Sequence, residues 1–156
     1  MTEAAELRYW EDFPVGSEAV HGTHAITEEE IVRFAREFDP QVFHTDPEAA
    51  RETAFGGLVA SGWHTVALFM GMYVRSQLLD SASQGSPGVE ELRWLHPVRP
   101  GDVLTARSLV VEAWPSETNP GRGTIVGEHA FVNQRGEVVM RFRARGFVAR
   151  RPAADR

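Results

Sequence analysis

The 156-residue sequence contains no cysteine, which excludes disulfide bonds, thiolate metal ligands and a cysteine nucleophile. It contains no lysine either: all 16 basic residues are arginine, which we attribute to codon bias rather than to mechanism. The net charge of -6 lacks the basic excess that phosphate neutralisation requires, so we expect no nucleic-acid partner. The opening segment MTEAAELRYWEDF lacks the apolar core of a signal peptide, and we expect a cytoplasmic protein.

One stretch, residues 55–74, lacks any formal charge and is long enough to span a bilayer. It contains four glycines and three polar residues, and an arginine follows it: Gly56, Gly57, Gly62, Gly71, Ser61, His64, Thr65 and Arg75. The rest of the chain is rich in predicted strands that can cover such a helix. We therefore interpret the stretch as part of a buried helix and expect no membrane association.

The first predicted helix covers residues 27–38. Thr27 and Glu30 form the pattern of a capping box, in which the threonine hydroxyl accepts from the Glu30 N–H while the glutamate reaches back. Apolar residues follow at helical spacing on one face. Pro40 disfavours the α conformation of Asp39, so this helix ends at Phe38 or Asp39.

Two further helices are expected. A short one covers residues 47–53 and is started either by Asp46 as N-cap or by Thr45 in a second capping box. A long one covers residues 62–79 and is apolar nearly all round, which indicates that the rest of the fold surrounds it. Residues 80–88 have the composition of a loop.

The remaining pattern is that of strands, predicted over residues 18–26, 89–95, 102–113, 123–133 and 137–149. We expect the last four to run as a meander. An antiparallel sheet curled around the long helix buries every side of that helix. The sequence therefore predicts an α+β protein with the hotdog fold, in a single domain of residues 1–156. A helix packed on a flat sheet is the alternative.

The segment FDPQVFH, residues 38–44, places a carboxylate and an imidazole five residues apart across a forced helix break. Because the chain turns at Pro40, the side chains of Asp39 and His44 can face one cavity. Adding water to the double bond of an enoyl thioester requires a base for the water and an acid for the α-carbon. Aspartate and histidine can serve these two roles, since the pKa values of both can be tuned toward neutral pH.

The same region resembles the signature of the MaoC-like dehydratases, the family that includes R-specific enoyl-CoA hydratases. The resemblance rests on FDPQVFHTDPEAARETAFGGLVASGWH and on HPVRPGDVLTA, residues 96–106, and it extends over residues 10–150. Many such hydratases have glycine before the aspartate and asparagine two residues after it. This chain has Phe38 and Gln41 there, which puts the substrate range in doubt more than the activity.

The resemblance implies that Asp39 and His44 hold the catalytic water, and that the backbone N–H of Gly62 binds the thioester oxygen. A glycine suits that position because a ligand must approach the backbone closely. Ser61 either orients Asp39 or caps the helix, and Gln41 either binds substrate or closes the turn. The substrate is then an acyl-CoA or acyl-carrier thioester, with no other cofactor and no metal.

Two other functions remain open from the sequence alone. One is a hotdog acyl-CoA thioesterase, and the other is an acyl-thioester-binding protein without turnover. The histidines outside the Asp39 segment are scattered without metal-ligand spacing, and we interpret them as structural. A lone hotdog sheet leaves edge strands exposed, so we expect a homodimer.

Overall fold

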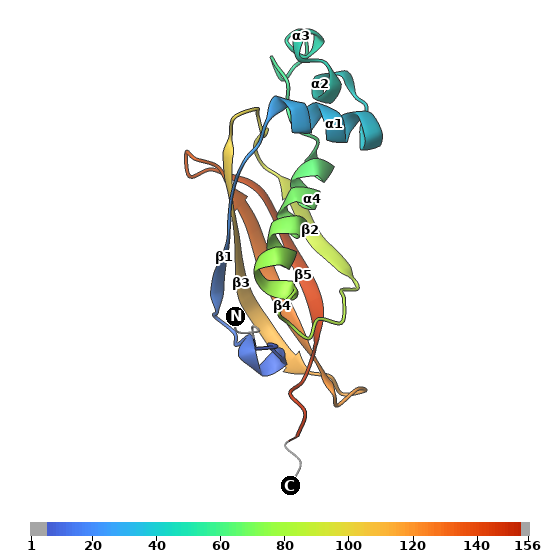
Figure 1. The fold of residues 1–156 in the computed structure, drawn as a ribbon, viewed down its shortest axis with the longest axis vertical. Coiled ribbons are helices and arrows are strands. Elements are labelled where there is room, and N and C mark those ends of the chain that lie inside the picture. Colours follow the sequence, from blue (N-terminus) through green and yellow to red (C-terminus); the bar gives the residue numbers. More distant parts are fainter. Residues whose placement is uncertain (1–5, 154–156) are drawn as a thin grey trace, which may run out of the picture.

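A computed structural model describes residues 6–153, in which five antiparallel strands form one sheet around a central helix (Figure 1). The strands are β1 (Glu18–Ala25), β2 (Gly88–Trp94), β3 (Val103–Pro115), β4 (Arg122–Val132) and β5 (Val138–Ala149). The helices are α1 (Glu28–Phe38), α2 (Val42–Thr45), α3 (Pro47–Ala50) and α4 (Gly62–Tyr73), with a 3-10 turn η1 (Trp10–Asp12) and a π-helical segment η2 (Val74–Leu78). The predicted α+β class is confirmed.

The strand order is β1-β3-β4-β5-β2, which corrects the predicted meander of the last four strands. The strands β3, β4 and β5 do follow one another as hairpin neighbours. The strand β2, however, lies at the far edge of the sheet and pairs with β5, where Val89 is opposite Ala144. Both β1 and β2 are therefore edge strands.

Local signals fix the ends of the short helices. The Thr27 hydroxyl accepts from the Glu30 N–H at 3.2 Å, as predicted. The Glu30 carboxylate does not return to the backbone: it accepts from the Thr27 hydroxyl and bonds the His24 ring. At α3 the cap is Asp46, which accepts from two backbone N–H groups, so the Thr45 alternative is not used. The four-residue helix α2 was not predicted.

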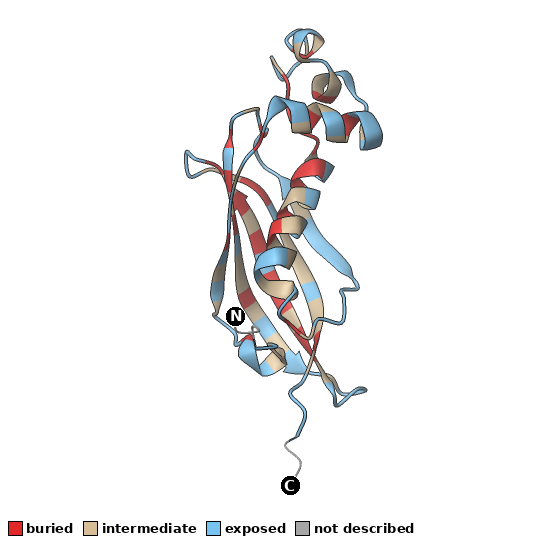
Figure 2. Cartoon of the chain, viewed as in Figure 1, coloured by how far each residue is buried: buried red, intermediate tan, exposed pale blue. Residues whose placement is uncertain are grey.

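The helix α4 is packed on one face of the sheet through buried residues that include Phe69 and Met72. The sheet lies around this helix without burying every side of it, which corrects the predicted complete burial. The side chains of Trp63 and Met70 are 59% and 46% exposed, and β2 beside them is exposed along most of its length (Figure 2). Because exposed residues of α4 such as Trp63 and Met70 are apolar, the sequence pattern predicts a helix that is buried on every side. No helix within residues 6–153 is long and apolar enough to cross a membrane.

Candidate active site

The structure brings Asp39 and His44 together at the amino end of α4. Asp39 is the residue that ends α1, with φ -152° and ψ 70°, and Pro40 then starts the turn into α2. His44 lies within α2 and is only 7% exposed. Its Nε2 atom is 3.3 Å from Oδ2 of Asp39. The helix break therefore places the two side chains face to face, as the sequence predicts.

Both oxygens of the Asp39 carboxylate accept hydrogen bonds. The Ser61 hydroxyl donates to Oδ2 at 2.7 Å, and the Gln41 amide donates to Oδ1 at 2.8 Å. Burial by itself raises the pKa of Asp39, but these two hydrogen bonds and the charge of His44 outweigh it, so the pKa is lowered from its ordinary value. Asp39 is therefore ionised at neutral pH, as a base must be.

The tautomer of His44 follows from its second contact. The Nδ1 atom lies 2.7 Å from the carbonyl oxygen of Val59, which can only accept, so Nδ1 carries a proton. In the neutral ring Nε2 is then an acceptor, and it faces another acceptor in Oδ2 of Asp39. Two acceptors at 3.3 Å require a proton between them or a water molecule that donates to both. Either arrangement suits acid–base chemistry.

Ser61 performs both of the roles that the sequence left open. Its hydroxyl donates to Asp39, and its oxygen also accepts from the Trp63 N–H at 3.3 Å as the N-cap of α4. The first turn of a helix leaves N–H groups without intrahelical partners. The Gly62 N–H has no hydrogen-bond partner within residues 6–153 and lies at the positive end of the helix dipole.

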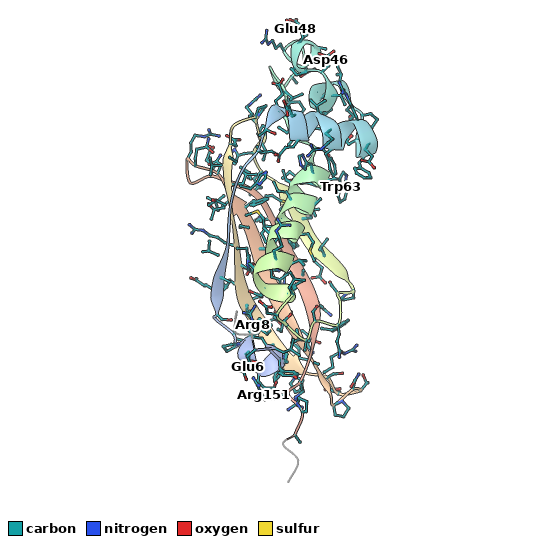
Figure 3. All side chains as sticks on the ribbon, in the orientation of Figure 1. Glu6, Arg8, Asp46, Glu48, Trp63 and Arg151 are labelled. Carbon is teal, nitrogen blue, oxygen red and sulfur yellow. The ribbon has the colours of Figure 1, made fainter. Side chains whose placement is uncertain are left out.

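The structure shows a cause for glycine at position 62 that was not predicted from the sequence. A β-carbon there would overlap Cε2, Nε1 and Cδ2 of the Trp94 indole. The indole N–H of Trp94 also donates to the carbonyl oxygen of Gly62 at 3.0 Å. The close approach is therefore made by a side chain of this protein. Trp63, labelled at the amino end of α4 in Figure 3, stacks edge-on against Trp94 at 5.3 Å.

A cavity of about 430 Å³, here called the site cavity, opens beside this cluster. Its walls include the predicted residues Asp39, Gln41, His44 and Gly62, whereas Ser61 is buried behind them. Another part of the wall, at the end of β2 and directly after it, was not predicted from the sequence: Trp94, Leu95, His96, Pro97 and Val98. No sequence motif indicates that this segment lies at the site. Its position there depends on the pairing of β2 with β5.

The other histidines form no hydrogen bond or ion pair with Asp39 or His44 in the described part of the chain. His64 stacks on Phe34 at 4.6 Å, away from the site cavity, and burial lowers its pKa. His96 lines the rim and lies 3.7 Å from Glu137. Within residues 6–153 no group of three or more His, Asp or Glu residues is arranged to hold a metal ion.

A family model described as a MaoC like domain matches residues 14–130. The chain belongs to the MaoC-like dehydratase family. The crystal structure of a MaoC-like dehydratase from Rhodospirillum rubrum is 43% identical, with a TM-score of 0.86, and the match covers 94% of this chain and 99% of that one. An R-hydratase from Pseudomonas aeruginosa is 25% identical, with a TM-score of 0.73, over 92% of this chain and 86% of that one.

The hotdog fold is confirmed as well. A Mycobacterium tuberculosis protein described as a double hotdog fold has a TM-score of 0.78 to this chain at 14% identity. The match covers 96% of this chain and 46% of that one, so the single MaoC-like unit corresponds to about half of the double protein. At this identity the likeness shows the fold alone.

Proposed function

We propose that this MaoC-like chain hydrates the 2,3 double bond of an enoyl thioester, and removes water from a 3-hydroxyacyl thioester in reverse, with coenzyme A as the thiol. The observation that carries the proposal is the pairing of the lowered-pKa carboxylate of Asp39 with the anchored imidazole of His44 beside the site cavity. Family membership supports the same reaction class.

In the hydration direction the resting pair holds one shared proton, written as the Asp39 carboxylate and the His44 imidazolium. The carboxylate takes one proton from a water molecule, whose oxygen forms a bond to C3 of the substrate. The electron pair of the double bond moves toward the thioester oxygen, and the His44 Nε2–H then delivers its proton to C2. A proton passing from Asp39 to His44, 3.3 Å apart, restores the pair.

The Gly62 N–H is the proposed donor to the thioester oxygen as that oxygen gains negative charge. It lies at the amino end of the 12-residue helix α4, whose dipole favours negative charge there. A preorganised donor of this kind contributes about 3 kcal/mol to transition-state stabilisation. In this arrangement Trp94 donates to the carbonyl oxygen of Gly62 and does not occupy its N–H.

A second copy of the chain is the proposed partner, forming a homodimer along the edge strand β2. The exposed large apolar side chains on this side of the molecule are Trp63, Met70, Val89, Trp94 and Leu95. An edge strand flanked by such a face is suited to strand pairing and to burial of apolar surface. Because Trp63 and Trp94 also line the site cavity, dimer formation would complete the wall of the site.

Purified protein incubated with crotonyl-CoA tests the proposal directly. Loss of the conjugated enoyl absorbance without release of free thiol is the expected result. Release of free thiol would indicate the thioesterase, and saturable binding without either change would indicate a binding protein. Asp39→Asn and His44→Gln should each lower turnover about 100-fold or more, and the double variant should be little worse, because both act on one water molecule.

Two matched substitutions control for general damage. Asp80→Asn removes an exposed carboxylate at the other end of the molecule, and His24→Gln removes a histidine that only pairs with Glu30. Both should keep near wild-type turnover. Normal activity in Asp39→Asn or His44→Gln would contradict the assigned roles even if the reaction itself were found.

A further inference from the structure

A second cavity, here called the inner cavity, lies between the carboxyl end of α4 and the sheet. Its volume is about 260 Å³, and its walls are mostly apolar, with Phe13, Met70, Val110, Ile125, Phe142 and Val148 among them. It shares no lining residue with the site cavity. The two cavities lie at opposite ends of α4, which begins at Gly62 and ends at Tyr73 (Figure 1).

A chain of hydrogen bonds passes behind one wall of the inner cavity. We assign the Ser76 proton to the bond with the carbonyl oxygen of Tyr73 at 3.3 Å, so that Ser76 accepts from Nδ1 of His21, 2.6 Å away. His21 then carries its proton on Nδ1, and its Nε2 accepts from the Ser108 hydroxyl, also at 2.6 Å. Ser108 lines the cavity, and because its proton is used in the bond to His21, it can only accept a hydrogen bond from a ligand.

His129 is the cross-strand neighbour of Ser108 in the pairing of β3 with β4. The side chains of directly paired residues lie within about 5 Å of each other. His129 is 6% exposed, and its ring forms no hydrogen bond with any residue of the 6–153 region; its Nδ1 is completely buried. The Nε2 edge of the ring lies over Gly127, another residue of the cavity wall, where a β-carbon would come within 2.6 Å.

We propose that the inner cavity binds a small uncharged aliphatic alcohol group, whose hydroxyl accepts from the His129 ring N–H and donates to the Ser108 oxygen. A hydroxyl matches the wall because it supplies one donor and one acceptor, whereas a ketone or ether oxygen can only accept. The apolar walls bury the carbon chain. This site is separate from the Asp39 and His44 pair and does not depend on the function proposed for it.

A charged ligand does not suit this wall. Burial lowers the pKa of His129 to about 4, so the ring is neutral at physiological pH. The cationic side chain of the wall is Arg145, which is exposed and pairs with Glu90 at 3.8 Å. A carboxylate buried against His129 and Ser108 would therefore have no cationic partner there, which costs several kcal/mol. The neighbouring rings of Phe69, Tyr73 and Phe142 pack on His129 and are uncharged.

Three compounds of matched chain length test the recognition: 1-hexanol, its methyl ether and hexanoate. Ring ¹⁵N shifts of histidine-labelled protein report binding and its location. We expect 1-hexanol to shift His129 saturably without shifting His44, and the ether to bind about five-fold more weakly, since one hydrogen bond contributes about 1 kcal/mol. Hexanoate should not shift His129. Equal binding of alcohol and ether, or no saturable shift at His129, would overturn the proposal.

Ser108→Ala separates recognition from a general packing effect. In this variant the preference for the alcohol over the ether should disappear, while affinity for the ether stays unchanged. Ser116→Ala, in the β3–β4 connection outside the cavity, should keep the full preference. A preference that survives Ser108→Ala would refute the assigned contact. If that variant fails to fold, the comparison of the three compounds on the wild-type protein decides alone.

Discussion

Replacing His129 with phenylalanine should make the protein less sensitive to acid. The ring of His129 is stacked on Phe142 at 4.7 Å and packed edge-on against Phe69 and Tyr73, and phenylalanine preserves these aromatic contacts. What it removes is a titratable group whose pKa burial lowers from 6.5 to about 4. The effect on stability as a function of pH follows from that difference.

The pKa of His129 in the folded chain lies below its value in the unfolded chain, so the unfolded chain binds the proton first as the pH falls. The stability of the folded state is unaffected by this group above pH 6.5, and is lost progressively between pH 6.5 and about 4. Below that range both states are protonated and nothing further is lost. The difference corresponds to about 3 kcal/mol in the free energy of unfolding.

Urea unfolding at fixed protein concentration, measured at intervals from pH 7.5 to 4, provides the assay. The wild-type free energy of unfolding should fall by about 3 kcal/mol more than that of His129→Phe over this range. His21 and His64 have lowered pKa values as well, again through burial first, so the variant should still lose stability in acid. Parallel curves for the two proteins would show that His129 is not buried as described.

Three other perturbations have definite expected outcomes. Ser61→Ala removes a donor from the Asp39 carboxylate, so the pKa of Asp39 should rise and the acid limb of the kcat/KM profile should move to higher pH; an unmoved limb would exclude Asp39 as the base. Gly62→Ala should displace the Trp94 indole, change tryptophan emission and lower the free energy of unfolding by about 1–3 kcal/mol. Adding Trp94→Ala to the same chain should restore most of that loss. Light scattering at micromolar concentration should give a dimer for the wild type and a monomer for Val89→Arg; a stable wild-type monomer would contradict the interface along β2.

Features that depend on a few neighbouring residues were predictable from the sequence. Thr27 caps α1, Pro40 restricts Asp39, and Asp46 caps α3, because each acts on backbone groups one to three residues away. The face-to-face placement of Asp39 and His44 depends on that same restriction of Asp39. The central helix and the strands were predictable from their hydrophobic pattern.

Features created by contacts between distant segments were not predictable. Trp94 meets Gly62 across 32 residues of chain, and β2 lies beside β5 rather than β3. The helix α2 has no side-chain cap of its own; its His44 ring is held by the carbonyl oxygen of Val59, 15 residues later. In each case the contacting residue or strand is too distant in the sequence for a local residue pattern to predict the contact.

The π-helical turn at Val74–Leu78 has a consequence for insertions and deletions in this chain. Such a turn accommodates one residue more than an α-helix of the same course, so it has the form of a single-residue insertion into α4. Deleting the extra residue of this turn would return it to α geometry and keep the residues after it in place, whereas deleting one residue within Gly62–Tyr73 would rotate everything after it by about 100°. After the second deletion Ser76 would leave His21, and the hydrogen-bond chain that ends at Ser108 would lose its first member. The length of this helix is therefore set to the residue.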